Sequence, residues 1–164
     1  MSVEFHDYSF EVKAAMDEHI LAALEECAAE LESQTKQNTT VGRVSGGKTK
    51  NNWQHKVVKS EKTAYIGNNL ETAIWLEFGT GEHAIPNPDG KGSRKGGWFI
   101  PIGNGDGMMS KAVAKAYGFR IYKGKNGMEY AHTYGMKPQR PFWNAYNRLK
   151  NAIIKRMQSS MKGL

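Results

Sequence analysis

The sequence has few of the features that mark secreted, disulfide-bonded or membrane-spanning proteins. Its 164 residues include one cysteine, Cys27, so an internal disulfide is excluded and a reducing compartment is expected. No stretch approaches the roughly 18 apolar residues that a membrane-spanning helix needs. Residues 1–10 are acidic and lack an apolar signal core, so we do not expect secretion.

The sequence also lacks the residue patterns of common active sites. Its five histidines show no metal-ligand spacing such as H-E-x-x-H, and no G-x-S-x-G nucleophile motif is present. Residues 42–49 match the G-x-x-x-x-G-K-T pattern of a P-loop, but the chain before and after them does not read as strand and helix. We therefore expect a flexible basic loop, no cofactor, no metal and no enzyme. A nucleotide-dependent enzyme would depend on Lys48.

Positive charge is scarce at the start of the chain and abundant afterwards. Residues 1–40 hold 9 Asp/Glu against Lys13 and Lys36, a net charge of −7, whereas residues 41–164 have a net charge of +14. Either the basic part faces nucleic acid, or the acidic part meets a basic surface on its own chain or on a neighbouring copy. We favour the second reading slightly, because opposed charged faces suit self-assembly. The candidate nucleic-acid contacts are Arg43, Lys48, Lys50, Arg148, Lys155 and Arg156.

Apolar residues at helical spacing predict one long helix near each end of the chain. The first, over residues 10–37, has the apolar stripe Met16, Ile20, Leu24, Cys27 and Leu31, in which Cys27 reads as a small core residue. The second, over residues 141–161, begins at Pro141, whose missing N–H costs nothing in a first turn.

Between these helices the sequence predicts strands and one long loop. Strands are expected at 53–59 and 63–66, and residues 124–127 form a hairpin signal between two further strands. Residues 79–107 contain nine glycines and three prolines, which predicts a flexible loop with only a short strand-like piece. We therefore expect one α+β domain over residues 1–164. Its two terminal helices would pack on a central antiparallel sheet, and a long Gly-rich loop would extend from it.

The most apolar run in the middle of the chain spans residues 73–81 and ends in Gly-Thr-Gly. The simplest architecture places it at the centre, with the terminal helices folded over it. Asn69 could cap a short helix over residues 70–78, whereas the alternation of Ile74, Leu76 and Phe78 favours a strand. Both readings remain open. Glu77 and Glu82 could form an acid/base pair, but a Glu77 carboxylate bonded to backbone N–H groups or to an arginine is the preferred reading.

Two motifs in order carry a resemblance to a known family. They are WLEFGTG at residues 75–81 and GMKPQRPF at residues 135–142, the second opening the last helix. With the flanking helices, this arrangement resembles the small neck or tail-completion proteins of long-tailed (siphophage-type) bacteriophages and prophages, also described as tail components or minor structural proteins. The similarity extends over residues 10–160. One departure is that Thr40 leads into an extended Gly/Lys loop, where the family has a compact step.

The resemblance assigns motif roles to seven residues. They are Glu77, Gly79 and Thr80 at the turn after the central run, and Gly135, Pro138, Pro141 and Phe142 at the start of the last helix. Glycine permits a tight reversal here, and Glu77 could fix that turn by accepting backbone hydrogen bonds. The candidate interface residues are Trp98, Phe99 and Trp143.

The resemblance implies a non-enzymatic virion protein that acts in head–tail joining or tail completion. The expected partners are other copies in a homo-oligomeric ring, with six the expected number, and neighbouring head-completion and tail proteins. Non-specific contact with passing DNA is also expected, whereas no contact with a membrane is expected. The location would be the head–tail junction or the head-proximal tail end, after assembly in the host cytoplasm. The alternative is a small basic nucleic-acid-binding protein that uses residues 42–62 and the C-terminal helix.

Overall fold

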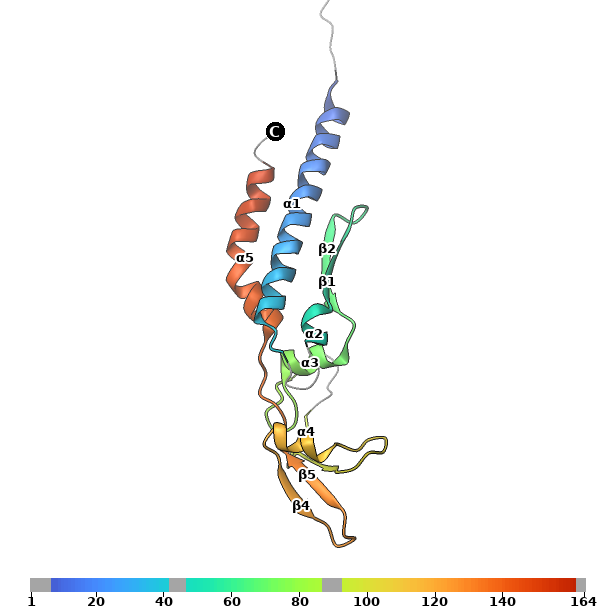
Figure 1. The fold of residues 1–164 in the computed structure, drawn as a ribbon. Coiled ribbons are helices and arrows are strands. Elements are labelled where there is room, and N and C mark those ends of the chain that lie inside the picture. Colours follow the sequence, from blue (N-terminus) through green and yellow to red (C-terminus); the bar gives the residue numbers. More distant parts are fainter. Residues whose placement is uncertain (1–6, 42–46, 87–92, 162–164) are drawn as a thin grey trace, which may run out of the picture.

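The computed structural model describes residues 7–41, 47–86 and 93–161. The chain is elongated, with two long helices and a hairpin at one end and a small sheet at the other (Figure 1). The predicted α+β class, the long N-terminal helix, the C-terminal helix and the antiparallel pairing are confirmed. Among the described helices, none combines the length and the apolar composition that crossing a lipid bilayer requires.

The first part of the fold is built around α1 (Ser9–Asn38). This helix contacts α5 (Pro141–Ser160) and the antiparallel hairpin of β1 (Trp53–Val58) and β2 (Thr63–Asn68). We call α1, α5 and this hairpin the helical part. Trp53 is buried where the three elements meet, and its indole Nε1 donates a 3.0 Å hydrogen bond to the buried hydroxyl of Thr39.

Burial along α1 decreases toward its N-terminus. Cys27 and Leu31 are buried as expected, together with Ala23, Ala28 and Thr35, whereas Met16, Ile20 and Leu24 of the same stripe are only half-buried. Residues 7–14 are exposed throughout, since α1 extends past the ends of α5 and of the hairpin (Figure 1). The predicted stripe is therefore the core of this part only over its C-terminal half.

The central apolar run forms a helix, which settles the open alternative. It is α3 (Glu71–Phe78), and Leu70, not Asn69, is the residue that precedes its first turn. The run is not the buried centre of the fold: within α3 only Ala73 is buried, and Trp75 is 38% exposed. A second short helix, α2 (Lys48–Asn51), lies just before β1.

The second part of the fold is a separate three-stranded antiparallel sheet. Its order is β3 (Trp98–Pro101), β5 (Glu129–Thr133) and β4 (Arg120–Lys123), and α4 (Lys111–Ala116) accompanies it. We call this the sheet part. The expected strands thus form two sheets. α1 packs on the smaller one, and α5 packs mainly against α1. Residues 87–92 of the expected Gly-rich loop lie outside the described residues, and β3 occupies part of the remainder.

Candidate functional site

The two sequence motifs meet in space between the helical part and the sheet part. The backbone N–H of Thr80 donates to the carbonyl of Met136 at 2.8 Å, and the N–H of Glu82 donates to that of Tyr134 at 2.9 Å. The Thr80 hydroxyl in turn accepts from the Met136 N–H at 2.9 Å. Residues 76–82 and 134–140 therefore run side by side, and we call this pair of segments the crossing.

Glycine is required at the crossing because the two backbones approach closely. Gly81 and Gly135 have φ values of +64° and +102°, which side chains rarely adopt. A Cβ at Gly81 would lie 2.1 Å from the carbonyl oxygen of Tyr134, and a Cβ at Gly135 would lie 2.1 Å from that of Thr80. The obstacle is backbone in both cases and has no flexible end that could move aside.

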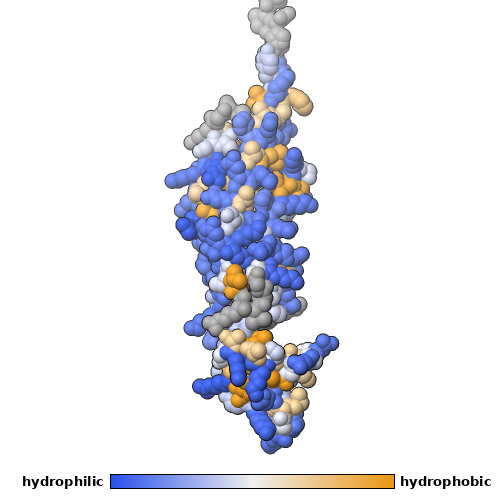
Figure 2. Space-filling view, viewed as in Figure 1, coloured by the Kyte–Doolittle hydropathy of each residue, from blue (hydrophilic) through white to orange (hydrophobic). Residues whose placement is uncertain are grey.

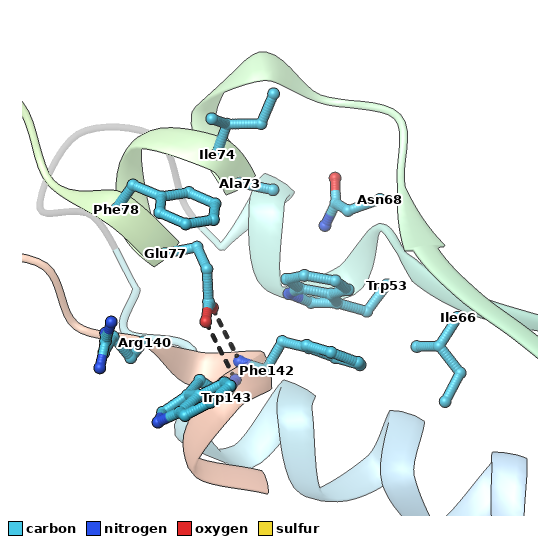
Figure 3. Close-up of a pocket in the computed structure, with 10 residues that line it drawn as sticks. All are labelled: Trp53, Ile66, Asn68, Ala73, Ile74, Glu77, Phe78, Arg140, Phe142 and Trp143. Carbon is cyan, nitrogen blue, oxygen red and sulfur yellow. Dashed lines mark hydrogen bonds between the residues drawn. The ribbon is translucent and has the colours of Figure 1, made fainter. Parts of the chain in front are cut away.

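The carboxylate of Glu77 joins α3 to the start of α5. Its Oε2 accepts from the backbone N–H of Phe142 and its Oε1 from that of Trp143, each at 3.0 Å (Figure 3). These N–H groups belong to the first turn of a helix, where no intrahelical acceptor exists and where a negative charge is stabilised. The residue preceding α5, Arg140, supplies no side-chain cap, so Glu77 takes that role from another element.

This geometry refines the sequence-based reading of Glu77. The expected bonds to backbone N–H groups are present, but the donors are in α5 and not in the Gly79–Gly81 turn. Glu82 is bonded separately, to the backbone N–H of Gly96 at 2.7 Å. Each carboxylate thus holds a structural contact of its own. Pro138 lies against Gly79, and Pro141 is fully buried at the first position of α5.

A mostly apolar cavity of about 430 Å³ lies beside this cap (Figure 3). Its lining residues are Trp53, Ile66, Asn68, Ala73, Ile74, Glu77, Phe78, Arg140, Phe142 and Trp143. The rings of Trp53 and Phe142 stack with centroids 6.2 Å apart, and the Arg140 guanidinium lies 5.4 Å from the centre of the Trp143 ring. The lining suits an apolar side chain, since its one carboxylate is occupied by backbone donors.

A histidine between two carboxylates ties the hairpin to α1. His55 Nδ1 lies 2.5 Å from Glu32 Oε2, and His55 Nε2 lies 3.1 Å from Glu25 Oε1. The hydrogen bonds to Glu32 and then Glu25 raise the pKa of His55 above its ordinary value, against the effect of burial. For Glu32, burial acts to raise the pKa, but the bonds to Lys36 and His55 together outweigh it and the pKa is lowered.

Further ion pairs join acidic α1 to basic residues elsewhere in the chain. Arg156 of α5 donates to Glu30 at 2.6 Å, and Lys62 of the hairpin turn pairs with Asp17. The acidic helix therefore meets basic groups of its own chain, as one reading of the charge pattern predicted.

The candidate nucleic-acid contacts do not gather at one place. Arg156 is already paired with Glu30, and Arg43 lies outside the described residues. Lys48 and Lys50 are in α2, whereas Arg148 and Lys155 are exposed on α5.

The candidate interface residues lie in different settings. Phe99 and Trp143 are 61% and 49% exposed, on β3 and α5 respectively. Trp98 is half-buried, and its ring lies over Gly81 on the opposite face of the sheet from Phe99.

Within residues 7–41, 47–86 and 93–161, no group of three or more His, Cys, Asp or Glu side chains could hold a metal ion.

Comparison with known proteins relates part of this chain to a described family. Residues 4–79 match a family model described as "Bacteriophage HK97-gp10, putative tail-component". The resemblance to phage tail components is confirmed. No curated protein and no solved structure matches the chain.

The HK97-gp10-like match covers α1, the β1–β2 hairpin and α3, and it ends at Gly79. It indicates a structural protein of a phage tail. The matched region includes Glu77 but not Phe142 and Trp143, the residues that Glu77 caps.

Sequence reasoning missed two features of this chain. One is the His55 cluster, because its partners lie 23 and 30 residues away on another element. The other is that aromatic side chains gather on one face of the three-stranded sheet. The alternation of Tyr130, His132 and Tyr134 along the chain could have indicated this.

Proposed function

We propose that this chain is a non-catalytic structural subunit of a tailed-phage or prophage virion. It acts in head–tail joining or tail completion and assembles with other copies of itself into a ring. The observation that carries the proposal is the family match over residues 4–79. The location would be the head–tail junction or the head-proximal end of the tail, after assembly in the bacterial cytoplasm.

The motif residues act as connectors, which supports a structural role. Gly81 and Gly135 let two distant segments pass within hydrogen-bonding distance, and Glu77 fixes the start of α5. A ring subunit needs such a connection, because its two ends must keep a constant orientation if successive contacts are to close on themselves.

The exposed apolar residues support contact with other subunits. Phe10, Val12, Phe99 and Trp143 are all between 49% and 81% exposed. Where exposed apolar side chains gather into a contiguous patch, that patch marks a surface that other molecules cover. The proposed partners are further copies, six in the ring to be tested, and the neighbouring head-completion and tail proteins.

A basic face of such a ring would also tolerate passing DNA. Arg148 and Lys155 are exposed along α5 and would supply non-specific phosphate contacts. Neutralising both side chains should reduce any DNA affinity and flatten its dependence on salt. The comparisons give no support to the alternative in which nucleic-acid binding is the main function.

Self-assembly is tested by measuring the mass of the purified protein over a concentration range, with native mass spectrometry or light scattering. A discrete closed oligomer is the expected result. A second test is made in the phage: the gene for this chain is deleted and the particles are inspected by electron microscopy. Filled heads and tails that fail to join, or tails of defective length, are expected, whereas normal virions would contradict the proposal.

A further inference from the structure

The N-terminal end of α1 carries large apolar side chains that no described element covers. Phe10 is 81% exposed and Val12 is 51% exposed, and the helix passes beyond its neighbours here (Figure 1). We call residues 9–20 the α1 end. A helix end without tertiary packing is only marginally stable in water, so a covering partner would stabilise it. Figure 2 shows apolar surface at this end of the molecule, among hydrophilic residues.

One face of the three-stranded sheet is also uncovered, and it is aromatic. The register places Phe99, His132 and Arg120 directly opposite one another on neighbouring strands, so their side chains share a face. The His132 ring lies 4.4 Å from that of Phe99 and 4.6 Å from that of Tyr134, between centroids. Phe99, Tyr122 and Tyr134 are 61%, 44% and 53% exposed. We call these five residues the aromatic face.

The two surfaces carry opposite charge and lie at opposite ends of the chain. The α1 end, residues 9–20, has a net charge of −2, with Glu11, Asp17 and Glu18 against Lys13. Residues 93–137 have a net charge of +6, with eight Lys/Arg against Asp106 and Glu129. Two α1 ends would repel each other, and so would two aromatic faces. Only the unlike pair attracts, and charge of this kind steers the choice of partner.

We propose that the α1 end of one copy docks on the aromatic face of the next copy. The inference rests on the proposed ring-forming function and names the interface of that ring. Phe10 would be covered by the aromatic rings, while Arg120 faces the acids of α1. Aromatic and arginine side chains of this kind carry most of the binding energy at protein interfaces.

Such an interface is head-to-tail and so does not end with a dimer. Each pair of copies leaves one α1 end and one aromatic face uncovered, and further copies add until the ring closes. Single-stranded nucleic acid could also stack on an aromatic face with basic surroundings. It would, however, leave the apolar residues of the α1 end exposed, so the second copy accounts for more of the structure.

The test uses two variants of the full chain, each with one surface disabled. The first carries Phe10→Ser and Glu18→Lys in the α1 end, and the second carries Phe99→Ser and Arg120→Glu in the aromatic face. The control carries Ile154→Ser and Lys150→Glu, which are equivalent changes at exposed α5 positions outside both surfaces. Far-ultraviolet circular dichroism and thermal unfolding confirm that all three fold as the wild type does.

Native mass spectrometry should show the control forming the wild-type oligomer. Each disabled variant alone should associate at least roughly tenfold more weakly. An equimolar mixture of the two should form 1:1 dimers and nothing larger, because one α1 end and one aromatic face remain intact between them. This rescue is specific to a head-to-tail contact, since an interface between identical surfaces would stay broken in the mixture.

The outcomes separate this inference from the proposed function. If the wild type forms a closed oligomer and both variants do so too, or the mixture fails to pair, the ring stands and this interface is wrong. A wild-type chain that stays monomeric at all concentrations contradicts both proposals. A labelled oligo-dT that binds the wild type but not the aromatic-face variant, without self-association, would assign that face to nucleic acid and overturn the inference.

Discussion

In the helical part α1 is contacted by α5 and by the β1–β2 hairpin, whereas one face of the β3–β5–β4 sheet is covered by no described element. The helical part buries Cys27, Leu31 and Trp53 and adds ion pairs between elements. The sheet part instead leaves Phe99, Tyr122 and Tyr134 largely exposed. Large side chains therefore stabilise the fold in one region and remain available for contacts in the other.

The crossing lies between these regions and belongs to neither. It is held by backbone hydrogen bonds and by one carboxylate that caps a helix, and it contains three glycines at positive φ, Gly79, Gly81 and Gly135. Substitutions at the crossing, and of buried side chains in the helical part, should therefore lower stability most, whereas substitutions on the aromatic face should have almost no effect.

The largest effect at the crossing is expected from Gly135→Ala. The new Cβ would meet a backbone oxygen at 2.1 Å, and the φ of +102° is strained for alanine as well. We expect a loss of roughly 3 kcal/mol or more in the free energy of unfolding, measured with urea. The matched control is Gly118→Ala, which has a φ of +70° but open space around it, and it should cost only about 1 kcal/mol. Equal losses in the two variants would show that the close approach is unimportant.

The next effect is expected from Glu77→Ala. It leaves the N–H groups of Phe142 and Trp143 without their acceptor and removes a negative charge from the start of α5. The free energy of unfolding should fall by about 2 kcal/mol. Glu77→Gln keeps one acceptor oxygen and should lose about half as much. Glu26→Ala, at an exposed position of α1, is the control and should change stability by less than about 0.5 kcal/mol.

A smaller, pH-dependent effect is expected from the His55 cluster. The pKa of His55 is raised in the folded chain, so its contribution is fully present below its ordinary value of 6.5 and is lost as pH rises through the raised value. The lowered pKa of Glu32 acts at the other end: its contribution is present above 4.5 and is lost as pH falls through the lowered value. Unfolding free energy should thus decline by about 0.5–1 kcal/mol on the alkaline side.

Urea unfolding at a series of pH values checks this. His55→Gln should remove most of the alkaline decline, and His83→Gln, at an exposed position, should leave it in place. A decline that persists in His55→Gln would assign it to other groups.

The elements that were predicted correctly are those with a local signal. The apolar spacing of α5 and its Pro141 start, the turn at Asn126 and Gly127, and the burial of Cys27 follow from residues close together in the chain. The sequence of residues 70–78 does not decide between helix and strand, because nine residues do not separate the two periodicities.

The features that could not be predicted from the sequence depend on contacts between residues that lie far apart in the chain. Glu77 caps α5 through the N–H of Phe142, 65 residues later, and Thr80 meets Met136 across 56 residues. The division of the strands into two sheets has the same cause, because strand signals do not specify which strand pairs with which. The N-terminal part of the α1 stripe, Met16, Ile20 and Leu24, is only half-buried because α5 and the hairpin end before α1 does (Figure 1). This depends on the lengths of those elements and not on α1 itself.

The smallest effect on stability is expected from Phe99→Ala. Phe99 is 61% exposed and its ring contacts are with His132 and Tyr122, so its removal should change the free energy of unfolding by at most about 0.5 kcal/mol. Trp53→Ala, which removes a buried aromatic side chain from the helical part, should cost about 3–5 kcal/mol in the same urea experiment. A loss of 2 kcal/mol or more for Phe99→Ala would mean that the aromatic face is a core of its own, and the contrast between the two regions would fail. A near-zero loss means that folding does not require an aromatic ring at this exposed position, so the ring remains available for a contact outside the chain.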